Sequence, residues 1–567
     1  MSEYRAPVKD VLFALRHLGG IDELAKTDRF AHADYDTIAS VLDELGRFMN
    51  EVFAPTNVIG DREGLVWSPE GVTTPAPFHS AYEKYVAAGW QGLNAQEEYG
   101  GAGFPAAIEL AKIEFSCAAN GALSMCPGLT TGAIECLQRW GSEEVKETFL
   151  RKMVTGEWTG TMNITEPQAG SDVGLATTRA VPHDDGTYRI TGTKIFISFG
   201  EHDLAENIVH LVLARLPDAP QGTRGISLFL VPKILPDGSP NDVRCVSIEH
   251  KLGIHASPTC VMSYGDGDGA VGWLIGEENG GMRAMFTMMN NARLNVGLQG
   301  VSIAERAMQQ AVSFARQRVQ GTREGRPARI IEFPDVRRML LRMKALTQAA
   351  RALAYYTAGQ TDRASLGESA ARARADLLTP LVKAYGTDVG VEVTSLALQV
   401  HGGMGYVEET GAAQHYRDAR ISPIYEGTNG IQAADLVGRK LSMEGGEVLA
   451  RLLSDIRRDA SSEPALLELA DVCADVSRHL LAASADDRLA GSYPFLTMLS
   501  TAVSGWLLAQ QLSALDDQNG DSGFAAAKRA AVRYYLDQVV PEAAGLRAAA
   551  VASAELLYSL DEEAFAA

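Results

Sequence analysis

The sequence contains no long uninterrupted run of apolar residues. Nowhere along its 567 residues do about eighteen or more apolar side chains follow one another, which is the length that a membrane-spanning helix requires. The N-terminal residues carry scattered charges and lack the apolar core of a secretory signal. We therefore expect a cytoplasmic protein without a membrane partner.

Cysteine is scarce, and its spacing is not that of a metal site. The six cysteines include no Cys-x-x-Cys pair, and no pair of histidines lies near them at zinc spacing. This pattern predicts buried, reduced thiols and no bound metal.

Positive charge is in the minority. The chain has 51 Lys and Arg against 71 Asp and Glu, a formal net charge of −20. A nucleic-acid-binding surface needs a basic excess, so we expect no nucleic-acid partner. A local basic patch could still hold a single nucleotide cofactor.

The hydrophobic periodicity places one β-rich segment between helical segments. An apolar stripe from Thr37 to Phe53 predicts a helix, and residues 187–198 predict paired strands after the Asp185-Gly186 turn signal. The stretch from Leu377 to Val400 is again helical and ends at His401-Gly402-Gly403. Two further helical faces are expected, consisting of Met339, Met343, Leu346, Ala350 and Leu353, and of Leu466, Leu469, Cys473, Val476 and Leu480.

These segments predict an α+β fold with five parts. The expected parts are an N-terminal segment (1–35), a helical domain (36–160), a barrel-like or sandwich β domain (161–280), a helical bundle (281–442) and a C-terminal helical extension (445–567). A polar loop is expected from Asp516 to Asp521. Strands do not alternate with helices, and the glycines at 100–103 follow no strand, so a dinucleotide-binding Rossmann fold is excluded.

Four short runs carry residues suited to chemistry. Residues 164–172, ITEPQAGSD, predict a loop whose backbone N–H groups can face a polar ligand, or a turn at a domain junction. Residues 194–198, KIFIS, place an aromatic and a hydroxyl on one side of a strand, which suits a planar heterocycle but also an ordinary sheet core. In QVHGGMGY (399–406), the glycines allow close backbone approach, and His401 reads as a structural histidine.

The fourth run contains a candidate general base. In IYEGTNGIQ (424–432), Glu426 stands between an aromatic residue and a glycine. Burial of such a carboxylate raises its pKa towards neutrality, which suits proton removal from a weak carbon acid.

In this order and spacing the four runs resemble the acyl-CoA dehydrogenase family, over roughly residues 40–442. The resemblance implies FAD as cofactor and an acyl-CoA as substrate. It places the isoalloxazine ring of FAD against six residues of the first loop and the β domain, namely Met162, Ile164, Thr165, Ser171, Phe196 and Ser198. Phe196 stands where many members have Trp, and Ser198 where a Thr is usual. Asn163 replaces a small residue, with no consequence evident from the sequence.

The resemblance also implies a homodimer or a dimer of dimers. In the family, the adenosine pyrophosphate of FAD reaches a second subunit, and Arg318, Gln399 and Gly403 match the positions involved. Thr428 is a further cofactor-binding candidate. The stretch after Arg318 lacks the common Thr-Phe-Gly, and we expect an irregular segment from 320 to 334.

The family's usual catalytic base aligns with Glu426. A minority of members place the base just before the residue that matches Arg293, where this chain has Ala292. Glu426 is thus the expected base, with Arg293 and Gly427 in the substrate site. Its backbone N–H and a ribityl hydroxyl of FAD are expected to polarise the thioester carbonyl. The product is then a trans-2-enoyl-CoA, and electron-transferring flavoprotein is the expected oxidant of the reduced flavin.

The N-terminal segment and the C-terminal extension resemble a longer-chain subgroup of this family. The subgroup includes 3-methylmercaptopropionyl-CoA dehydrogenases of dimethylsulfoniopropionate breakdown, so 3-methylthiopropionyl-CoA is the expected substrate. Ordinary short- or medium-chain acyl-CoAs of fatty-acid β-oxidation are the alternative. A DNA-protecting relative also carries a tail, but residues 447–567 hold nine basic and eighteen acidic residues, a net charge of −9. Further alternatives are a flavin monooxygenase or oxidase on the same fold, and a non-catalytic CoA-binding or scaffold protein.

Overall fold

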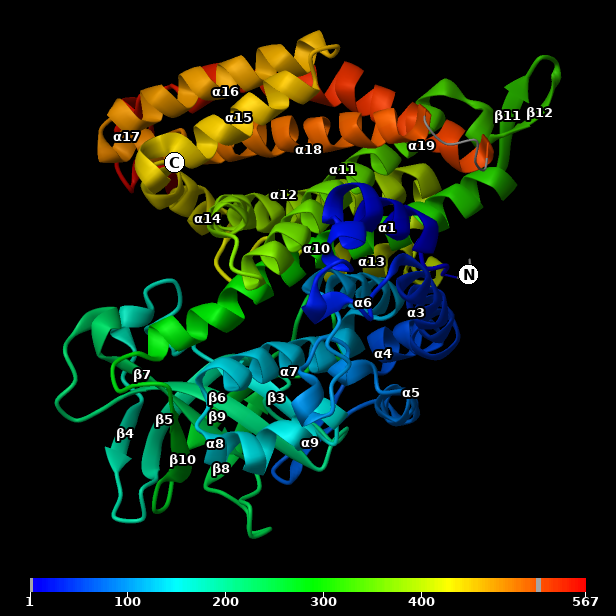
Figure 1. Cartoon of the computed structure of the whole chain (residues 1–567). Helices are drawn as coiled ribbons and strands as arrows, with labels where there is room; N and C mark the ends of the chain where they lie inside the picture. Colours follow the sequence, from blue (N-terminus) through cyan, green and yellow to red (C-terminus); the bar gives the residue numbers. More distant parts are fainter. Residues whose placement is uncertain (1–3, 517–521, 567) are drawn as a thin grey trace. The chain divides into compact units, whose positions relative to one another are not determined.

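The computed structural model describes residues 4–516 and 522–566, so most of the loop expected from Asp516 to Asp521 lies outside the described residues. The chain divides into two compact units. We call Glu44–Ala292 the β-containing unit, and Met1–Asp43 together with Arg293–Ala567 the helical unit. Figure 1 shows the elements that build each unit.

The first half of the β-containing unit is helical. Its main helices are α4 (Asn57–Glu63), α5 (Ala76–Ala87), α6 (Ala106–Ala119), α7 (Gly121–Trp140), α8 (Glu143–Val145) and α9 (Arg151–Thr155). A short hairpin, β1 (Val66–Ser68) and β2 (Gly71–Thr73), follows α4. Helix α7 begins at Asn120, whose side-chain oxygen accepts a hydrogen bond from the backbone N–H of Leu123 at 3.0 Å.

The second half of this unit is an eight-stranded sheet. Its strands are β3 (Trp158–Asn163), β4 (Arg179–Pro182), β5 (Tyr188–Ser198), β6 (Asn207–Arg215), β7 (Ile226–Pro232), β8 (Val243–Ile248), β9 (Thr259–Tyr264) and β10 (Ala270–Ile275). The order is β10-β7-β6-β4-β5-β9-β8, and β10 also pairs with β5, so five of the strands close into a ring. Strand β3 lies parallel to β6. The barrel-like β domain is confirmed.

Strand β6 separates two hydrophobic cores. Val209, Leu211 and Leu213 belong to the core shared with α7, α9 and the start of α10, whereas Val212 and Ala214 belong to the core inside the ring. Successive side chains of a strand point to opposite faces, so one buried strand serves both cores. This explains why β6 is buried at nearly every position rather than at alternate ones.

The paired strands expected at 187–198 are wrong in one respect. These residues form the single strand β5, and its hairpin partner is β4, which precedes the Asp185-Gly186 turn. The register of β5 against β9 shifts between Lys194 and Ile197. The bulge breaks the alternation that the prediction relied on, because one extra residue is inserted into the strand.

Helix α10 (Gly281–Gln317) is continuous from the end of the β-containing unit into the helical unit. Two long helices, α11 (Pro334–Ser365) and α12 (Ser369–His401), then run side by side (Figure 1). The five residues expected to form one face of α11 are all buried, and α12 ends at His401 with Gly402 as its C-cap, within the predicted stop at His401-Gly402-Gly403. Short helices α13 (Ala412–Ala419) and α14 (Asn429–Asp435) follow.

The segment expected to be irregular after Gln320 is partly regular. Strands β11 (Val319–Arg323) and β12 (Arg326–Arg329) form an antiparallel hairpin, and its tip turns at Glu324 and Gly325, which both have positive φ. Most of its side chains are exposed. No apolar alternation marks these strands, so the periodicity of the sequence could not reveal them.

The C-terminal extension consists mainly of α-helices. These are α15 (Glu447–Asp459), α16 (Pro464–Ala482), α17 (Ala485–Ala490), α18 (Ser492–Asp516), α19 (Ser522–Tyr534), α20 (Val540–Ala544) and α21 (Arg547–Ala550). The five predicted face residues of α16 are buried. Helix α18 packs against α11, α12, α14 and α16. A helix covered on so many sides needs apolar residues all round, and α18 has them over most of its length.

The N-terminal segment also packs on α11. Its helices are α1 (Val8–Ala14) and α2 (Ile21–Leu24), joined by one π-helical turn at Leu15–Gly19. A Cβ at Gly359 of α11 would lie 2.4 Å from the carbonyl oxygen of Gly19, so the two backbones meet where no side chain fits.

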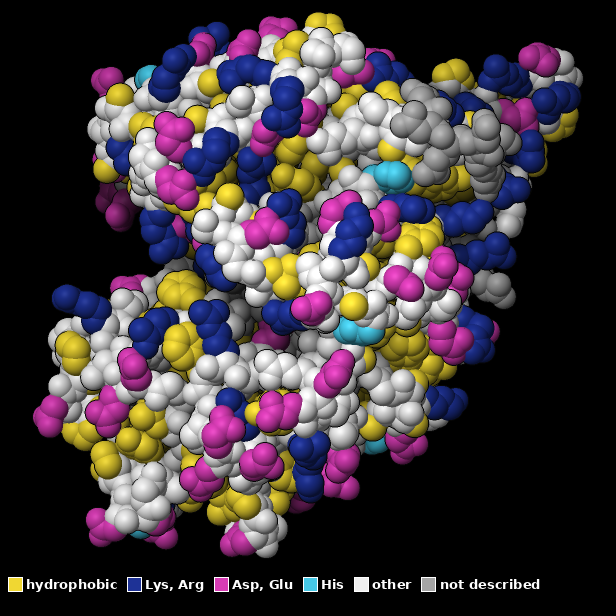
Figure 2. All heavy atoms as spheres, in the orientation of Figure 1, with side chains coloured by type: hydrophobic (Ala, Val, Ile, Leu, Met, Phe, Trp, Pro, Cys, Tyr) yellow, Lys and Arg dark blue, Asp and Glu magenta, His cyan; other side chains and the backbone are white. Residues whose placement is uncertain are grey.

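All six cysteines are buried and unbridged, as predicted. Among the described residues no helix combines the length and apolar character needed to cross a membrane. Acidic and basic side chains are interspersed on the face shown in Figure 2.

Candidate functional site

Glu426 stands on a left-handed turn immediately before α14. Its φ is 56° and that of Gly427 is 81°, so two successive residues adopt a conformation that L-residues rarely take. The side-chain oxygen of Thr428 then caps α14 by accepting from the N–H of Ile431 at 3.2 Å. The buried Gln432 donates from Nε2 to the carbonyl oxygens of Glu426 (3.4 Å) and Gly427 (3.2 Å). The turn is thereby held in a strained form.

Burial and two cations set the protonation of Glu426. Burial raises the pKa of its carboxyl, while the charges of Arg293 and Lys383 lower it. The net pKa stays above the ordinary range of a glutamate, because burial outweighs the two cations. All three residues belong to the helical unit.

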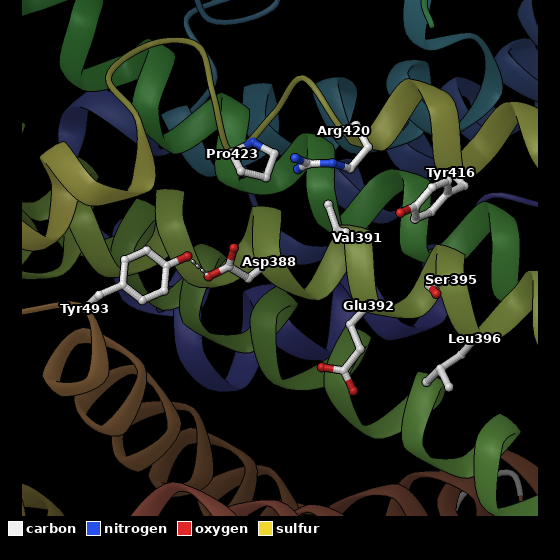
Figure 3. Close-up of a pocket in the computed structure, with 9 residues that line it drawn as sticks. All are labelled: Asp388, Val391, Glu392, Ser395, Leu396, Tyr416, Arg420, Pro423 and Tyr493. Carbon is white, nitrogen blue, oxygen red and sulfur yellow. Dashed lines mark hydrogen bonds between the residues drawn. The ribbon is translucent and has the colours of Figure 1, made fainter. Parts of the chain in front are cut away.

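Lys383, whose charge acts on Glu426, belongs to a hydrogen-bonded network that begins in the interior and ends at the surface. Its Nζ donates to Oδ1 of Asn429 at 2.9 Å, and Asn429 Nδ2 donates to Oδ1 of Asp388 at 2.9 Å. Tyr493 of α18 donates its hydroxyl to Oδ2 of Asp388 at 2.7 Å. Figure 3 shows Tyr493 and Asp388 pointing toward each other at one end of a pocket of about 500 Å³. The C-terminal extension thus contributes a side chain to the network that surrounds the base.

Arg293 is buried with little compensation. Its Nη1 lies 3.8 Å from Oδ2 of Asp435, and its Nε is a buried donor without a partner among the described residues. Burial lowers the pKa of its guanidinium, while Asp435 and Glu426 raise it. Its neighbour Ala292 lies against the hydrophobic core of the β-containing unit and has no ionisable group. Arg293 thus lies near Glu426 and keeps an Nε–H donor that no described residue accepts.

In the β-containing unit the ITEPQAGSD loop is attached to strand β5. Lys194 Nζ donates to the carbonyl oxygen of Ile164 at 3.1 Å and to Oε1 of Glu166 at 2.8 Å, and the N–H of Ile195 donates to the carbonyl of Thr165 at 2.9 Å. Glu166 also accepts from both the N–H and the hydroxyl of Thr177 and of Thr178. The loop is therefore rigid at its start, although Ser171 near its end is exposed.

Phe196 is a large aromatic side chain that the fold leaves uncovered. It is 58% exposed and has a φ of 59°, at the bulge of β5. Ile197 beside it is buried, whereas Ser198 is partly exposed, and the hydroxyl of Thr161 donates to the Ser198 carbonyl at 2.7 Å. Strand β3, which carries the buried Met162, and the loop after it are thus joined to the strand of Phe196. A flat ligand would find here an aromatic face beside backbone and hydroxyl groups.

The structure gives Asn163 a role that the sequence did not reveal. Its Nδ2 lies 3.2 Å from Nδ1 of His210, and its Oδ1 accepts from the hydroxyl of Tyr264 at 2.7 Å. All three side chains are buried, and burial lowers the pKa of His210 to about 3, so this histidine is neutral. Asn163 therefore satisfies two polar groups inside the sheet.

Three expected cofactor residues lie in the helical unit on exposed positions. Arg318 begins the β11–β12 hairpin, and Ile330 donates its N–H to the Arg318 carbonyl at 2.8 Å. Gln399 and Gly403 flank the end of α12. A Cβ at Gly403 would meet open space, so packing within the described chain does not require glycine there. His401 is buried, and Nδ1 lies 2.7 Å from the carbonyl oxygen of Ala397, which fits the structural role expected for it.

Four residues of this network were not predicted from the sequence, namely Lys383, Asp388, Asn429 and Tyr493. One signal was present, because Lys383 interrupts the apolar pattern of the helix predicted from Leu377 to Val400. A charged residue in a buried helical position is costly unless it is paired, so it marks a site of interest. Its partners lie up to 110 residues away and could not be inferred from spacing.

The chain matches models of the acyl-CoA dehydrogenase domains along most of its length. The N-terminal domain model matches residues 37–157, the middle domain model residues 161–266, and the C-terminal domain model residues 279–441. A further model, described as acetyl-CoA dehydrogenase C-terminal like, matches residues 460–561.

Individual relatives cover the whole chain. It is 47% identical to 3-methylmercaptopropionyl-CoA dehydrogenase of Ruegeria pomeroyi over 95% of this chain and 96% of the relative. It is 36% identical to a butyryl-CoA dehydrogenase of Syntrophomonas wolfei over 99% of each chain. The solved structure of an acyl-CoA dehydrogenase complexed with FAD from Bacillus anthracis superposes with a TM-score of 0.75, at 21% identity, over 92% of this chain and 89% of that one. This last likeness concerns the fold.

Proposed function

The chain belongs to the acyl-CoA dehydrogenase family, and we propose that it converts an acyl-CoA thioester into the trans-2-enoyl-CoA with FAD as cofactor. The observation that carries this proposal is the environment of Glu426. Its carboxyl stands on a strained turn, burial raises its pKa, and two cations oppose that rise. A carboxylate with such a pKa is suited to remove a proton from a weak carbon acid.

The β-containing unit offers a surface that fits the isoalloxazine of FAD. The exposed Phe196 and the rigid start of the ITEPQAGSD loop supply an aromatic face and backbone polar groups. We assign six residues to this side of the cofactor, namely Met162, Ile164, Thr165, Ser171, Phe196 and Ser198. When bound, FAD supplies the acceptor for the hydride that leaves the β-carbon.

Four residues of the helical unit are assigned to the rest of the cofactor. Arg318, Gln399 and Gly403 are exposed, which leaves them accessible to the adenosine pyrophosphate of a FAD bound by a second subunit. Thr428 is the fourth, beside the base. This assignment implies a homodimer or a dimer of dimers.

Glu426 takes the α-proton on its carboxylate, and its backbone N–H donates to the thioester carbonyl oxygen. Such a donor stabilises the negative charge that develops on that oxygen as the proton leaves. Gly427 lets the chain turn directly after the base, and Arg293 helps to keep the carboxyl ionised. We assign Arg293 and Gly427 to the substrate site for these reasons.

We assign 3-methylthiopropionyl-CoA as the substrate, which places the reaction in dimethylsulfoniopropionate breakdown. The support is the 47% identity to the Ruegeria pomeroyi dehydrogenase over nearly the whole of both chains. A short- or medium-chain acyl-CoA is the second candidate, supported by the 36% identity to butyryl-CoA dehydrogenase. Electron-transferring flavoprotein is the proposed oxidant, and the cytoplasm the proposed location.

The substrate is tested with purified flavoprotein and an artificial electron acceptor. The panel comprises 3-methylthiopropionyl-, butyryl-, hexanoyl- and octanoyl-CoA, and kcat/KM is expected to be highest for the first. A higher kcat/KM for octanoyl-CoA would contradict the assignment of 3-methylthiopropionyl-CoA and favour a medium-chain acyl-CoA. Rapid turnover with oxygen alone would instead indicate an oxidase.

The base is tested with Glu426→Gln in an anaerobic stopped-flow experiment. This variant should keep its yellow FAD complex but no longer bleach with acyl-CoA. Glu409→Gln, at an exposed position in the same unit, serves as the control and should bleach at the normal rate. Normal bleaching of Glu426→Gln would remove Glu426 as the base.

A further inference from the structure

Helix α12 carries a lysine that the proposed chemistry does not use. Lys383 is fully buried, near the middle of a 33-residue helix. An ammonium group in such a place is costly unless charged partners compensate for the lost water. Among the described residues, its ammonium donates one hydrogen bond, to the neutral amide oxygen Oδ1 of Asn429 at 2.9 Å. The compensation must therefore come from carboxylates that act through space.

Two carboxyls supply this compensation. Burial is the main cause that lowers the pKa of Lys383, and Arg293 also lowers it, whereas Glu426 and Asp388 raise it; the resulting pKa is about 8. The influence is mutual, since the charge of Lys383 lowers the pKa of Glu426. At neutral pH the ammonium remains mostly protonated and faces the candidate base.

We propose that Lys383 is a positioning residue that keeps Glu426 ionised and anchors the start of α14 next to it. The inference rests on the proposed function, because it assigns Lys383 a role toward the base of that reaction. Lys383 does not itself contact the thioester. It acts through the charge of Glu426 and through the amide of Asn429.

The anchoring is visible in the bonds of Asn429. Its Oδ1 accepts from Lys383, while its Nδ2 lies within hydrogen-bonding distance of the Ala384 carbonyl (3.2 Å), Thr387 Oγ1 (3.0 Å) and Asp388 Oδ1 (2.9 Å). Asn429 is the first residue of α14 and lies three residues after Glu426. One buried side chain therefore ties the strained turn of the base to a full turn of α12.

The other charged groups near the base also face further charged or polar groups. Arg293 of α10 faces both Glu426 and Asp435 of α14, and Asp435 also accepts from Arg439 Nε at 2.5 Å. Asp388 is held by Tyr493 and Asn429, and the charge of Arg420 also lowers its pKa. The guanidinium groups keep their charge at every pH of interest. Arg293 lowers the pKa of Glu426 more strongly than Lys383 does, but Arg293 also faces the carboxylate of Asp435. Replacing Lys383 therefore removes a charge near Glu426 without breaking an ion pair among the described residues.

The test is the pH dependence of flavin reduction by limiting acyl-CoA in the stopped-flow experiment. The rate should fall at low pH as Glu426 becomes protonated, and we call this part of the profile the acid limb. Lys383→Met and Lys383→Gln should both move the acid limb to higher pH by about one unit, since a neighbouring cation lowers a carboxyl pKa by about that much or more. The rate at high pH should be kept, because the base is still present. The glutamine retains a donor for Asn429 and thereby protects the fold. Lys383→Arg, which keeps the charge, should restore the limb.

Lys440→Met, at a partly exposed lysine of the same unit, provides the control and should leave the acid limb in place. An unmoved limb in both neutral variants would overturn the inference. So would a shift in Lys383→Met alone, because the hydrogen bond rather than the charge would then be responsible. These results differ from failure of the proposed function, in which Glu426→Gln itself would still bleach.

Discussion

Lys194 Nζ lies 2.8 Å from Oε1 of Glu166, and both side chains are buried. Burial alone would raise the pKa of Glu166. Lys194 and the hydrogen bonds from Thr178 and Thr177 instead lower it to about 2. The pair joins the ITEPQAGSD loop to strand β5, so it stabilises the surface assigned to the flavin.

Lys194→Met should destabilise the β-containing unit by about 3–5 kcal/mol, because a buried carboxylate loses its partner. It should also weaken retention of FAD. The measurement is chemical unfolding followed by tryptophan fluorescence, with flavin release recorded in parallel. Arg244→Met, which breaks the exposed ion pair with Asp266, should cost no more than about 1 kcal/mol. Equal effects of the two variants would contradict the role given to the buried pair.

The Lys194–Glu166 pair should also make the stability of the fold depend on pH. The folded-state pKa of Glu166 lies below the ordinary value of about 4.3 for an unfolded glutamate. The contribution of Glu166 to the free energy of unfolding is therefore fully present above about pH 4.3 and is lost as the pH falls towards 2. Acid unfolding of Lys194→Met should accordingly show a weaker dependence on pH in this window than the parent protein.

Gly427 and Gly430 provide a matched pair of substitutions around the base. Gly427 has a φ of +81°, and a Cβ there would lie 2.9 Å from Nε2 of Gln432. Gly427→Ala should cost about 1–2 kcal/mol and lower the flavin-reduction rate at least tenfold, because it displaces the base. Gly430 is helical, and its nearest outside atom would be 3.6 Å away.

Gly430→Ala should therefore be neutral or stabilising, as expected for alanine within a helix. Both rates are read from anaerobic flavin bleaching, and both stabilities from thermal unfolding. Similar bleaching rates in the two alanine variants would show that the left-handed turn does not position Glu426.

Replacing Phe196 by glycine should affect stability and FAD affinity in opposite directions. A non-glycine residue at its φ of 59° carries a strain of about 1–3 kcal/mol, so Phe196→Gly should stabilise the FAD-free protein or leave its stability unchanged. The same variant should bind FAD more weakly, because it loses the aromatic face. Phe196→Trp should retain FAD. Equilibrium dialysis with FAD and unfolding of the apoprotein measure the two quantities, and unchanged FAD affinity in the glycine variant would refute the assignment.

Tyr493→Phe should weaken the attachment of the C-terminal extension. The variant removes the donor at 2.7 Å from the partly buried carboxyl of Asp388, at a cost of about 0.5–1.5 kcal/mol. Tyr534→Phe, at a partly buried tyrosine of α19, should have little effect. Limited proteolysis of the folded protein should cut the extension of Tyr493→Phe faster than that of Tyr534→Phe. Identical cleavage rates would show that the bond contributes little.

The sequence was most informative where function depends on short contiguous runs. The four runs together, with Ala292 at the rival position, nominated Glu426, which stays a prediction, and the helical periodicities predicted the buried faces of α11 and α16 correctly. The bulge in β5 and the β11–β12 hairpin escaped prediction, because neither follows a hydrophobic alternation. Lys383, Asn429 and Tyr493 escaped it for another reason. Their hydrogen-bonded network joins three distant helices, and only the folded chain brings them together.

Helix α18 contacts α11, α12 and α14 at once, and its Tyr493 completes the hydrogen bonding of Asp388. The extension is therefore not a detachable module added to a finished enzyme. A gene shortened at residue 446 would encode a chain with uncovered apolar helix faces and a carboxyl missing one of its donors. Loss of the extension and preservation of the loop that holds Glu426 are thus not independent evolutionary events. Any ancestor without α18 must have covered the same faces with another surface.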